Sequence, residues 1–232
     1  MTTILIDVFI LGTVVFCAWR GYKNGLIRGV FGVVALIVSL LIANIAAQAY
    51  ADEAKGMLMP FVDGIVDKTL TDMIEEGVEY QPLEHAHEVE DIDFGTAYTA
   101  LRRIGLPESS AFRIAEMAME DEETEGTPSD LIADKLSTTL SFVAVFGIAF
   151  LLIAIVFAVI GNLVGVVFSL PGLKLVDIIS GSVLGLLKGI IIVYTVAVIV
   201  RYFGLLALST LEKTFLLKYL VNSNPIANML GV

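Results

Sequence analysis

The chain has 232 residues, of which 57% are hydrophobic and only 17% are charged, and its mean hydropathy is +0.86. Soluble domains average roughly 45–50% apolar and 25% charged residues, so this composition excludes an ordinary soluble protein and indicates an integral membrane protein. The formal net charge of −11 argues against nucleic-acid binding, because acidic surfaces repel phosphates. The single cysteine, Cys17, excludes an intramolecular disulfide.

Membrane spans are predicted wherever an apolar helix reaches or approaches the roughly 20 residues needed to cross a bilayer core. Four segments qualify: Ile4 to Trp19, Leu26 to Ala49, part of the uncharged run from Leu136 to Leu173, and Ile178 to Val200. We therefore expect an all-α polytopic protein with about four transmembrane helices. The first two occupy residues 1–50 and the last two occupy residues 137–201.

A polar insert, residues 51–136, separates the two predicted helix pairs. Positions 51–135 hold 22 of the 25 acidic residues and 6 of the 14 basic ones, so the acidity is confined to this region. Apolar residues near helical spacing predict the buried face of a helical hairpin. They are Met57, Leu58, Phe61, Ile65, Leu70, Met73 and Ile74, and then Phe112, Ala115, Met117 and Met119.

Two further helices are predicted from the sequence around the spans. Thr127-Pro-Ser-Asp130 combines a capping box with proline at the first helical position, so a helix should begin there and run directly into the third span. Residues 202–232 predict an amphipathic interfacial tail whose helix ends at Asn222-Ser-Asn-Pro225.

The basic residues near the spans predict the orientation of the chain in the membrane. Arg20, Lys23 and Arg28 lie between the first two spans, and Lys174 and Lys188 lie near the start of the fourth. Cytoplasmic connections carry an excess of Lys and Arg, so both connections are expected in the cytoplasm. The insert and both termini are then expected to be extracytoplasmic.

A repeated glycine pattern predicts close helix packing. Glycines recur every four residues at Gly181, Gly185 and Gly189, which places them on one ridge of a helix, where another backbone can approach closely in lipid. The segments 21–30 and 181–190 share the pattern G-x-x-x-G-L-[IL]-[RK]-G-[VI]. This pattern predicts two helix-pair repeats of parallel orientation, with Arg28 and Lys188 at equal depth.

Several of these residues together resemble the CvpA family, the bacterial colicin V production proteins. The resemblance rests on Asp7, on the turn with Gly21, Gly25, Arg28 and Gly29, and above all on Gly172-Leu-Lys-Leu-Val-Asp177-x-x-x-Gly181-x-x-x-Gly185-x-x-Lys188-Gly189. It implies a multi-pass protein of the bacterial plasma membrane, linked to colicin V production, toxin biosynthesis and envelope functions. The large acidic insert departs from the compact members of the family.

The charged residues of this pattern allow more than one interpretation. Asp7 is either a functional intramembrane charge or an interfacial residue near the N-terminus. Asp177 either favours the start of its own helix through the helix dipole or anchors a headgroup or partner. Lys188 can snorkel to the cytoplasmic headgroups.

No catalytic, cofactor or metal site is predicted. His85 and His87 lie among acidic residues between Glu84 and Asp93, but their spacing matches no established metal site, and a solvated acidic linker explains them better. The sequence contains no P-loop and no G-x-S-x-G motif. An enzyme is therefore the weakest hypothesis.

Two function classes remain, and they differ in what the bundle does. The favoured one is an assembly or scaffold component in envelope maintenance or toxin secretion. Its expected partners are the lipid bilayer, a membrane or extracytoplasmic protein bound through the insert, and a second copy of the chain. The alternative is a small transporter or channel.

Overall fold

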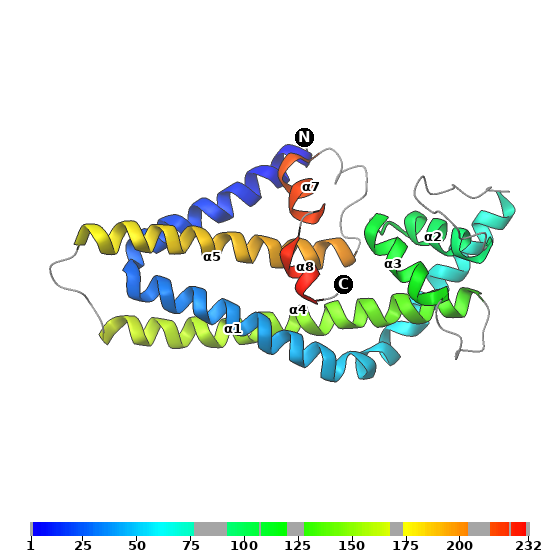
Figure 1. Cartoon of the computed structure of the whole chain (residues 1–232), viewed down its shortest axis with the longest axis horizontal. Helices are drawn as coiled ribbons and strands as arrows, with labels where there is room; N and C mark the ends of the chain where they lie inside the picture. Colours follow the sequence, from blue (N-terminus) through cyan, green and yellow to red (C-terminus); the bar gives the residue numbers. More distant parts are fainter. Residues whose placement is uncertain are drawn as a thin grey trace.

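A computed structural model describes residues 2–76, 92–106, 108–119, 128–167, 174–203, 214–222 and 224–230. Regular structure in these residues is α-helical, which confirms the all-α part of the predicted fold class (Figure 1). The helices are α1 (Thr2–Glu75), α2 (Ile92–Ile104), α3 (Glu108–Met119), α4 (Pro128–Val167), α5 (Lys174–Tyr202), α7 (Phe215–Asn222) and α8 (Pro225–Leu230).

Three of the described helices are long and apolar enough to cross a membrane. The candidate segments lie within Ile4–Glu75, Ser129–Asn162 and Val176–Tyr202. The outer face of α4 carries large apolar side chains that are 53–63% exposed, namely Ile148, Leu151, Leu152 and Ile155. A contiguous apolar surface of this kind suits contact with lipid.

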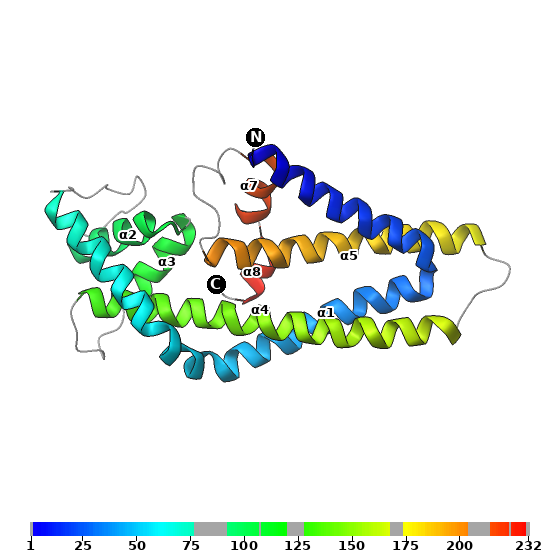
Figure 2. The ribbon, with the colours of Figure 1, turned by 180° about the vertical axis from the view of Figure 1, so that it is seen from behind.

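Helix α1 contains both of the first two predicted spans, because a single residue reverses its direction. Gly25 has φ 75° and ψ −178°, a conformation that glycine adopts without the penalty of a Cβ. Residues 2–24 run toward this bend at an angle to α5 and cross it, and the remainder of α1 returns alongside α4 (Figures 1 and 2). The basic residues expected in a loop therefore lie on helices on either side of the bend.

The membrane bundle is organised around α1. This helix packs against both α4 and α5, whereas α4 and α5 contact each other much less. The buried cluster of the bundle comprises Leu36, Leu40, Ala43 and Ala47 of α1, Val143, Phe146 and Phe150 of α4, Val198 and Tyr202 of α5, and Ile226, Ala227 and Leu230 of α8.

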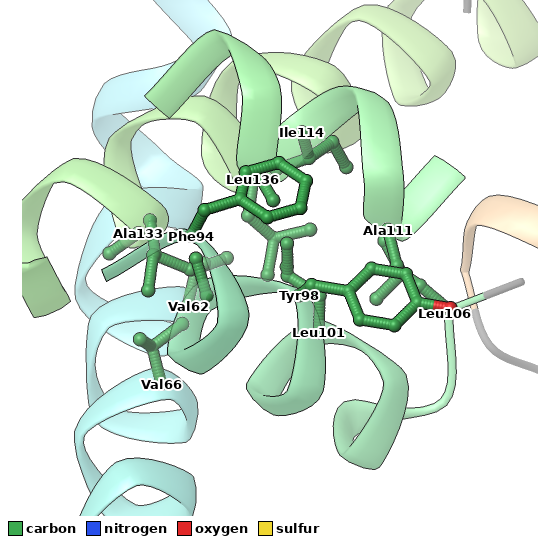
Figure 3. Packing of buried hydrophobic residues seen from close by; sticks show 13 residues of the cluster. Val62, Val66, Phe94, Tyr98, Leu101, Leu106, Ala111, Ile114, Ala133 and Leu136 are labelled. Atoms are coloured by element: carbon green, nitrogen blue, oxygen red, sulfur yellow. The ribbon is translucent and has the colours of Figure 1, made fainter. Parts of the chain in front are cut away.

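The residues predicted to form the insert include the last part of α1, helices α2 and α3, and the start of α4, and these helices share one buried hydrophobic cluster. Helices α1 and α4 continue without a break through the expected domain boundaries at residues 50/51 and 136/137. Helix α4 begins at Pro128, which confirms the predicted continuous helix into the third span. Figure 3 shows Val62 and Val66 of α1 meeting Leu101, Ile114 and Leu136 from the other three helices.

The predicted buried face of the insert is largely wrong. Met73, Leu70, Ala115 and Met119 do belong to the packed side, but six other residues are exposed: Met57, Phe61, Ile65, Ile74, Phe112 and Met117. At 100° per residue, Val62 and Val66 point roughly opposite to Met57. Apolar residues occur on both faces of this part of α1, so periodicity alone could not select the one that α2 and α3 cover.

The C-terminal tail packs onto the bundle. Leu217 and Val221 of α7 lie against Ala197 of α5, with Ile6 and Ile10 of α1 beside them. The predicted helix end is confirmed, since α7 stops at Asn222 and α8 starts at Pro225. The interfacial position of the tail stays a prediction.

Candidate functional site at the helix crossing

The two glycine patterns meet each other where the first part of α1 crosses α5. A methyl group at Gly185 would lie 2.9 Å from Cα of Gly21, and one at Gly21 would lie 2.8 Å from Cα of Gly185. The methyl group at Gly21 would also overlap the carbonyl oxygen of Gly181. Both neighbours are backbone atoms and cannot rotate away. A side chain at either glycine would therefore clash with the backbone of the other helix.

The same close approach extends along α5 in both directions. A Cβ at Gly189 would lie 3.0 Å from Cβ of Cys17, and one at Gly29 would lie 3.0 Å from Cβ of Leu184. At the bend, a Cβ at Gly25 would lie 2.7 Å from Oδ1 of Asp177. The glycines of the family pattern thus form one continuous contact between α1 and α5, which we call the glycine crossing.

The geometry of the glycine crossing does not support the predicted equivalence of the two segments. Gly25 has a positive φ and ends the first part of α1, whereas Gly185 lies inside the uninterrupted helix α5. The two glycines therefore have different structural roles. Their shared spacing places them on two surfaces that contact each other, and the helix-pair repeat stays a prediction.

Asp177 joins the glycine crossing to the start of the returning part of α1. The backbone N–H of Leu26 donates a hydrogen bond to Oδ1 of Asp177 at 2.7 Å. Gly25 has no side chain with which to cap this helix start, so the carboxylate comes from α5. A carboxylate at this position also interacts favourably with the helix dipole. The sequence predicted that Asp177 favours the start of its own helix or anchors a headgroup or partner, and this contact with Leu26 was missed. The absence of a capping side chain before Leu26 was the signal that could have indicated it.

Asp7 caps a different helix. Its two carboxylate oxygens accept hydrogen bonds from the backbone N–H groups of Phe215 and Leu216, each at 3.1 Å. These are the first two residues of α7, whose unpaired amides need acceptors. This contact gives Asp7 a structural partner, and a further functional role for its charge stays a prediction.

Three cationic side chains line a cavity of about 170 Å³ beside the bend of α1. They are Arg20, Arg28 and Lys188, and none of the described residues that line the cavity with them is acidic. Nε of Arg28 is buried and has no hydrogen-bond partner. Gly32 leaves room for the lysine, because a methyl group there would lie 3.4 Å from Nζ of Lys188. Arg28 and Lys188, expected at equal depth, thus share one cavity.

Arg201, near the end of α5, joins three helices. Its guanidinium donates to the backbone oxygen of Val221 in α7 at 3.0 Å and to Oγ of Ser109 in α3. The neighbouring Tyr202 accepts a hydrogen bond from Ser110 at 3.3 Å. The C-terminal end of α5 is therefore tied to the insert and to the tail.

In the described part of the chain, no group of three or more His, Cys, Asp or Glu residues is placed to hold a metal ion. The acidic segment with His85 and His87 lies outside the described residues.

Comparison with known proteins finds a family similarity in the second half of the chain. A family model described as Colicin V production protein matches residues 121–225. No curated protein and no solved structure matches the chain. The matched range contains α4, α5 and α7, and with them Asp177, Gly181, Gly185, Lys188 and Gly189. Over residues 121–225, the chain matches the model of the colicin V production (CvpA) family, the family that its sequence pattern resembles.

Proposed function

We propose that this protein is a membrane-embedded assembly component in envelope maintenance or toxin production, and that its insert binds a protein partner. The observation that carries this proposal is the continuity of α1 and α4 from the apolar bundle into the insert. Two continuous helices couple the position of the insert directly to the packing of the bundle.

Polar contacts reinforce this connection. Nζ of Lys55 in α1 lies 2.5 Å from Oδ1 of Asp134 in α4, and Ser129 at the start of α4 hydrogen-bonds Asp67 of α1. Together with the contacts of Arg201, these bonds brace the insert against three membrane helices. A partner bound to the insert would therefore be held at a fixed place relative to the bilayer.

The exposed side of α1 within the insert suggests the chemistry of that partner. Met57 and Phe61 are each 73% exposed, and Asp52, Glu53 and Asp72 are exposed on the same helix. Apolar side chains among carboxylates suit a protein surface that combines apolar contacts with Lys or Arg. This surface is where we place the partner.

Site-specific photo-crosslinking in cells tests the proposal. A benzophenone amino acid replacing Phe61 should give a discrete protein adduct, because that position faces outward from the insert. The matched control is the same amino acid at Leu151, which is 60% exposed on α4 and should react mainly with lipid. Absence of a protein adduct at Phe61, or the same adduct at both positions, would contradict the proposal.

The alternative function, a small transporter or channel, is favoured by the cavity beside the bend. Its test is a flux or conductance measurement on the purified protein in liposomes. An assembly component should leave solute flux at the level of empty liposomes, whereas saturable flux would favour the transporter.

We further propose four passes across the membrane, with the insert and both termini extracytoplasmic. The bend of α1, the end of α4 and the start of α5 lie at one end of the bundle, and the N-terminus lies toward the insert end (Figures 1 and 2). In a Cys17→Ala background, Glu116→Cys should react with an impermeant maleimide in intact spheroplasts. Asn24→Cys should react only after lysis, and the reverse pattern would contradict this orientation.

A further inference from the structure

We propose that the cavity beside the bend of α1 is a binding site for the phosphate group of an anionic ligand. The cavity draws its cations from three places in the chain: Arg20 before the bend, Arg28 after it, and Lys188 on α5. The fold therefore adds Lys188 of α5 to two cations of the basic segment around the bend of α1.

Among the described residues, those that line this cavity carry three positive charges and no negative one. In the described residues, no ion pair connects Arg20, Arg28 or Lys188 to a carboxylate. The carboxylate closest to the bend, that of Asp177, accepts the hydrogen bond from Leu26. Arg28 and Lys188 are only partly exposed, so their mutual repulsion is less screened than on an open surface. A bound anion would offset this repulsion.

The donors available in the cavity match a phosphate group. The guanidinium groups of Arg20 and Arg28 offer planar sets of N–H donors, and Nε of Arg28 is buried without a partner. Lys188 adds a compact point charge, and the side-chain amides of Asn24 and Asn162 add neutral donors. A volume of about 170 Å³ exceeds by far the roughly 10–15 Å³ that a single water requires.

The position of the cavity between membrane helices allows two sources of the same chemistry. Basic pockets between transmembrane helices bind the headgroups of anionic lipids, and intramembrane cations also mark the paths of soluble anions. Both ligands would present phosphate oxygens to the same three side chains. Inorganic phosphate and phosphatidylglycerol therefore serve as the two probes.

Binding is measured on the purified full-length protein in a zwitterionic detergent at fixed chloride concentration. Radiolabelled orthophosphate is followed by equilibrium dialysis, and phosphatidylglycerol against phosphatidylcholine by native mass spectrometry. Arg28→Gln and Lys188→Gln should each weaken binding at least tenfold. Lys23→Gln is the matched control, because Lys23 is exposed at the same end of the bundle, stacks over Trp19 and does not line the cavity. This variant should change binding less than twofold.

A second readout uses the wild-type protein and so does not depend on the folding of the variants. Bound ligand should slow the acylation of Lys188 by an amine-reactive reagent, but not that of Lys23. Effects with free phosphate identify a soluble anion, and effects with phosphatidylglycerol alone identify a lipid headgroup. The proposal is overturned if neither probe protects Lys188, or if folded Arg28→Gln and Lys188→Gln proteins bind both probes as the wild type does.

Discussion

The glycine crossing and the core of the insert solve the same packing problem in opposite ways. At the crossing, the backbones of α1 and α5 touch, and an added methyl group at Gly21 or Gly185 would meet backbone atoms within 2.9 Å. In the insert, Leu101, Ile114 and Ile132 fill the space between helices and are 0–2% exposed. Burial of apolar side chains stabilises a subdomain in water but gives little advantage in lipid, where close packing of small residues replaces it.

The crossing should therefore be the region least tolerant of added volume. Gly185→Leu places four heavy atoms against Gly21 and Cys17, and the rigid backbone on both helices leaves no room for relaxation. We expect the free energy of unfolding in detergent to fall by about 3 kcal/mol or more, with reduced abundance in the membrane. Gly12→Leu is the matched control, because no atom lies within 4 Å of a Cβ at Gly12. Equal melting temperatures for the two variants would show that the helices do not cross at these glycines.

The insert should instead be most sensitive to lost volume. Ile114 is 2% exposed and Met117 is 39% exposed, although both lie on α3. Ile114→Ala should lower the free energy of unfolding by about 2–4 kcal/mol through lost burial and a residual cavity, and Met117→Ala by less than about 1 kcal/mol. Chemical denaturation followed by circular dichroism measures both. Comparable losses for the two variants would mean that the insert has no fixed core at Ile114.

The two glycines with positive φ allow the cost of backbone strain to be compared with the cost of a steric clash. Gly25 (φ 75°) and Gly105 (φ 113°) both have positive φ, but only Gly25 has a neighbour, Asp177, within 4 Å of an added Cβ. Gly105→Ala should cost about 1–2 kcal/mol from backbone strain alone. Gly25→Ala should cost more, because it adds a clash with Asp177, and thermal melting would reveal the difference. A smaller effect at Gly25 than at Gly105 would be evidence against the observed bend.

The smallest expected effect is the loss of the hydrogen bond with which Asp177 of α5 caps the returning part of α1. Asp177→Ala removes the acceptor for the backbone N–H of Leu26 and should cost about 1 kcal/mol. Asp177→Asn keeps a side-chain oxygen and should lose less than half as much. Melting temperatures of the two variants test this order, and an equal loss would indicate that charge rather than hydrogen bonding matters at this position.

The same contrast explains how much of each region could be predicted from the sequence. Glycines every four residues mark one face of a helix, so the sequence identified the packing faces that contain Gly21 and Gly185. It did not show that these two faces pack against each other. The core of the insert depends on which side of α1 receives α2 and α3. That choice is a long-range contact, and the apolar residues Phe61 and Val62 gave no local signal for it. The caps by Asp7 and Asp177 join residues more than 150 positions apart, beyond the reach of any local pattern.

The contact of the first part of α1 with α5 can be tested directly with the natural cysteine. A Cβ at Gly189 would lie 3.0 Å from Cβ of Cys17, so a shift of a few tenths of an ångström brings Gly189→Cys within disulfide range. After mild oxidation in membranes, neither Cys17 nor the introduced cysteine should react with a maleimide mass tag. Reduction should restore the reaction of both thiols. Leu187→Cys, on the exposed side of α5, should keep two reactive thiols. Two free thiols in oxidised Gly189→Cys would contradict the glycine crossing.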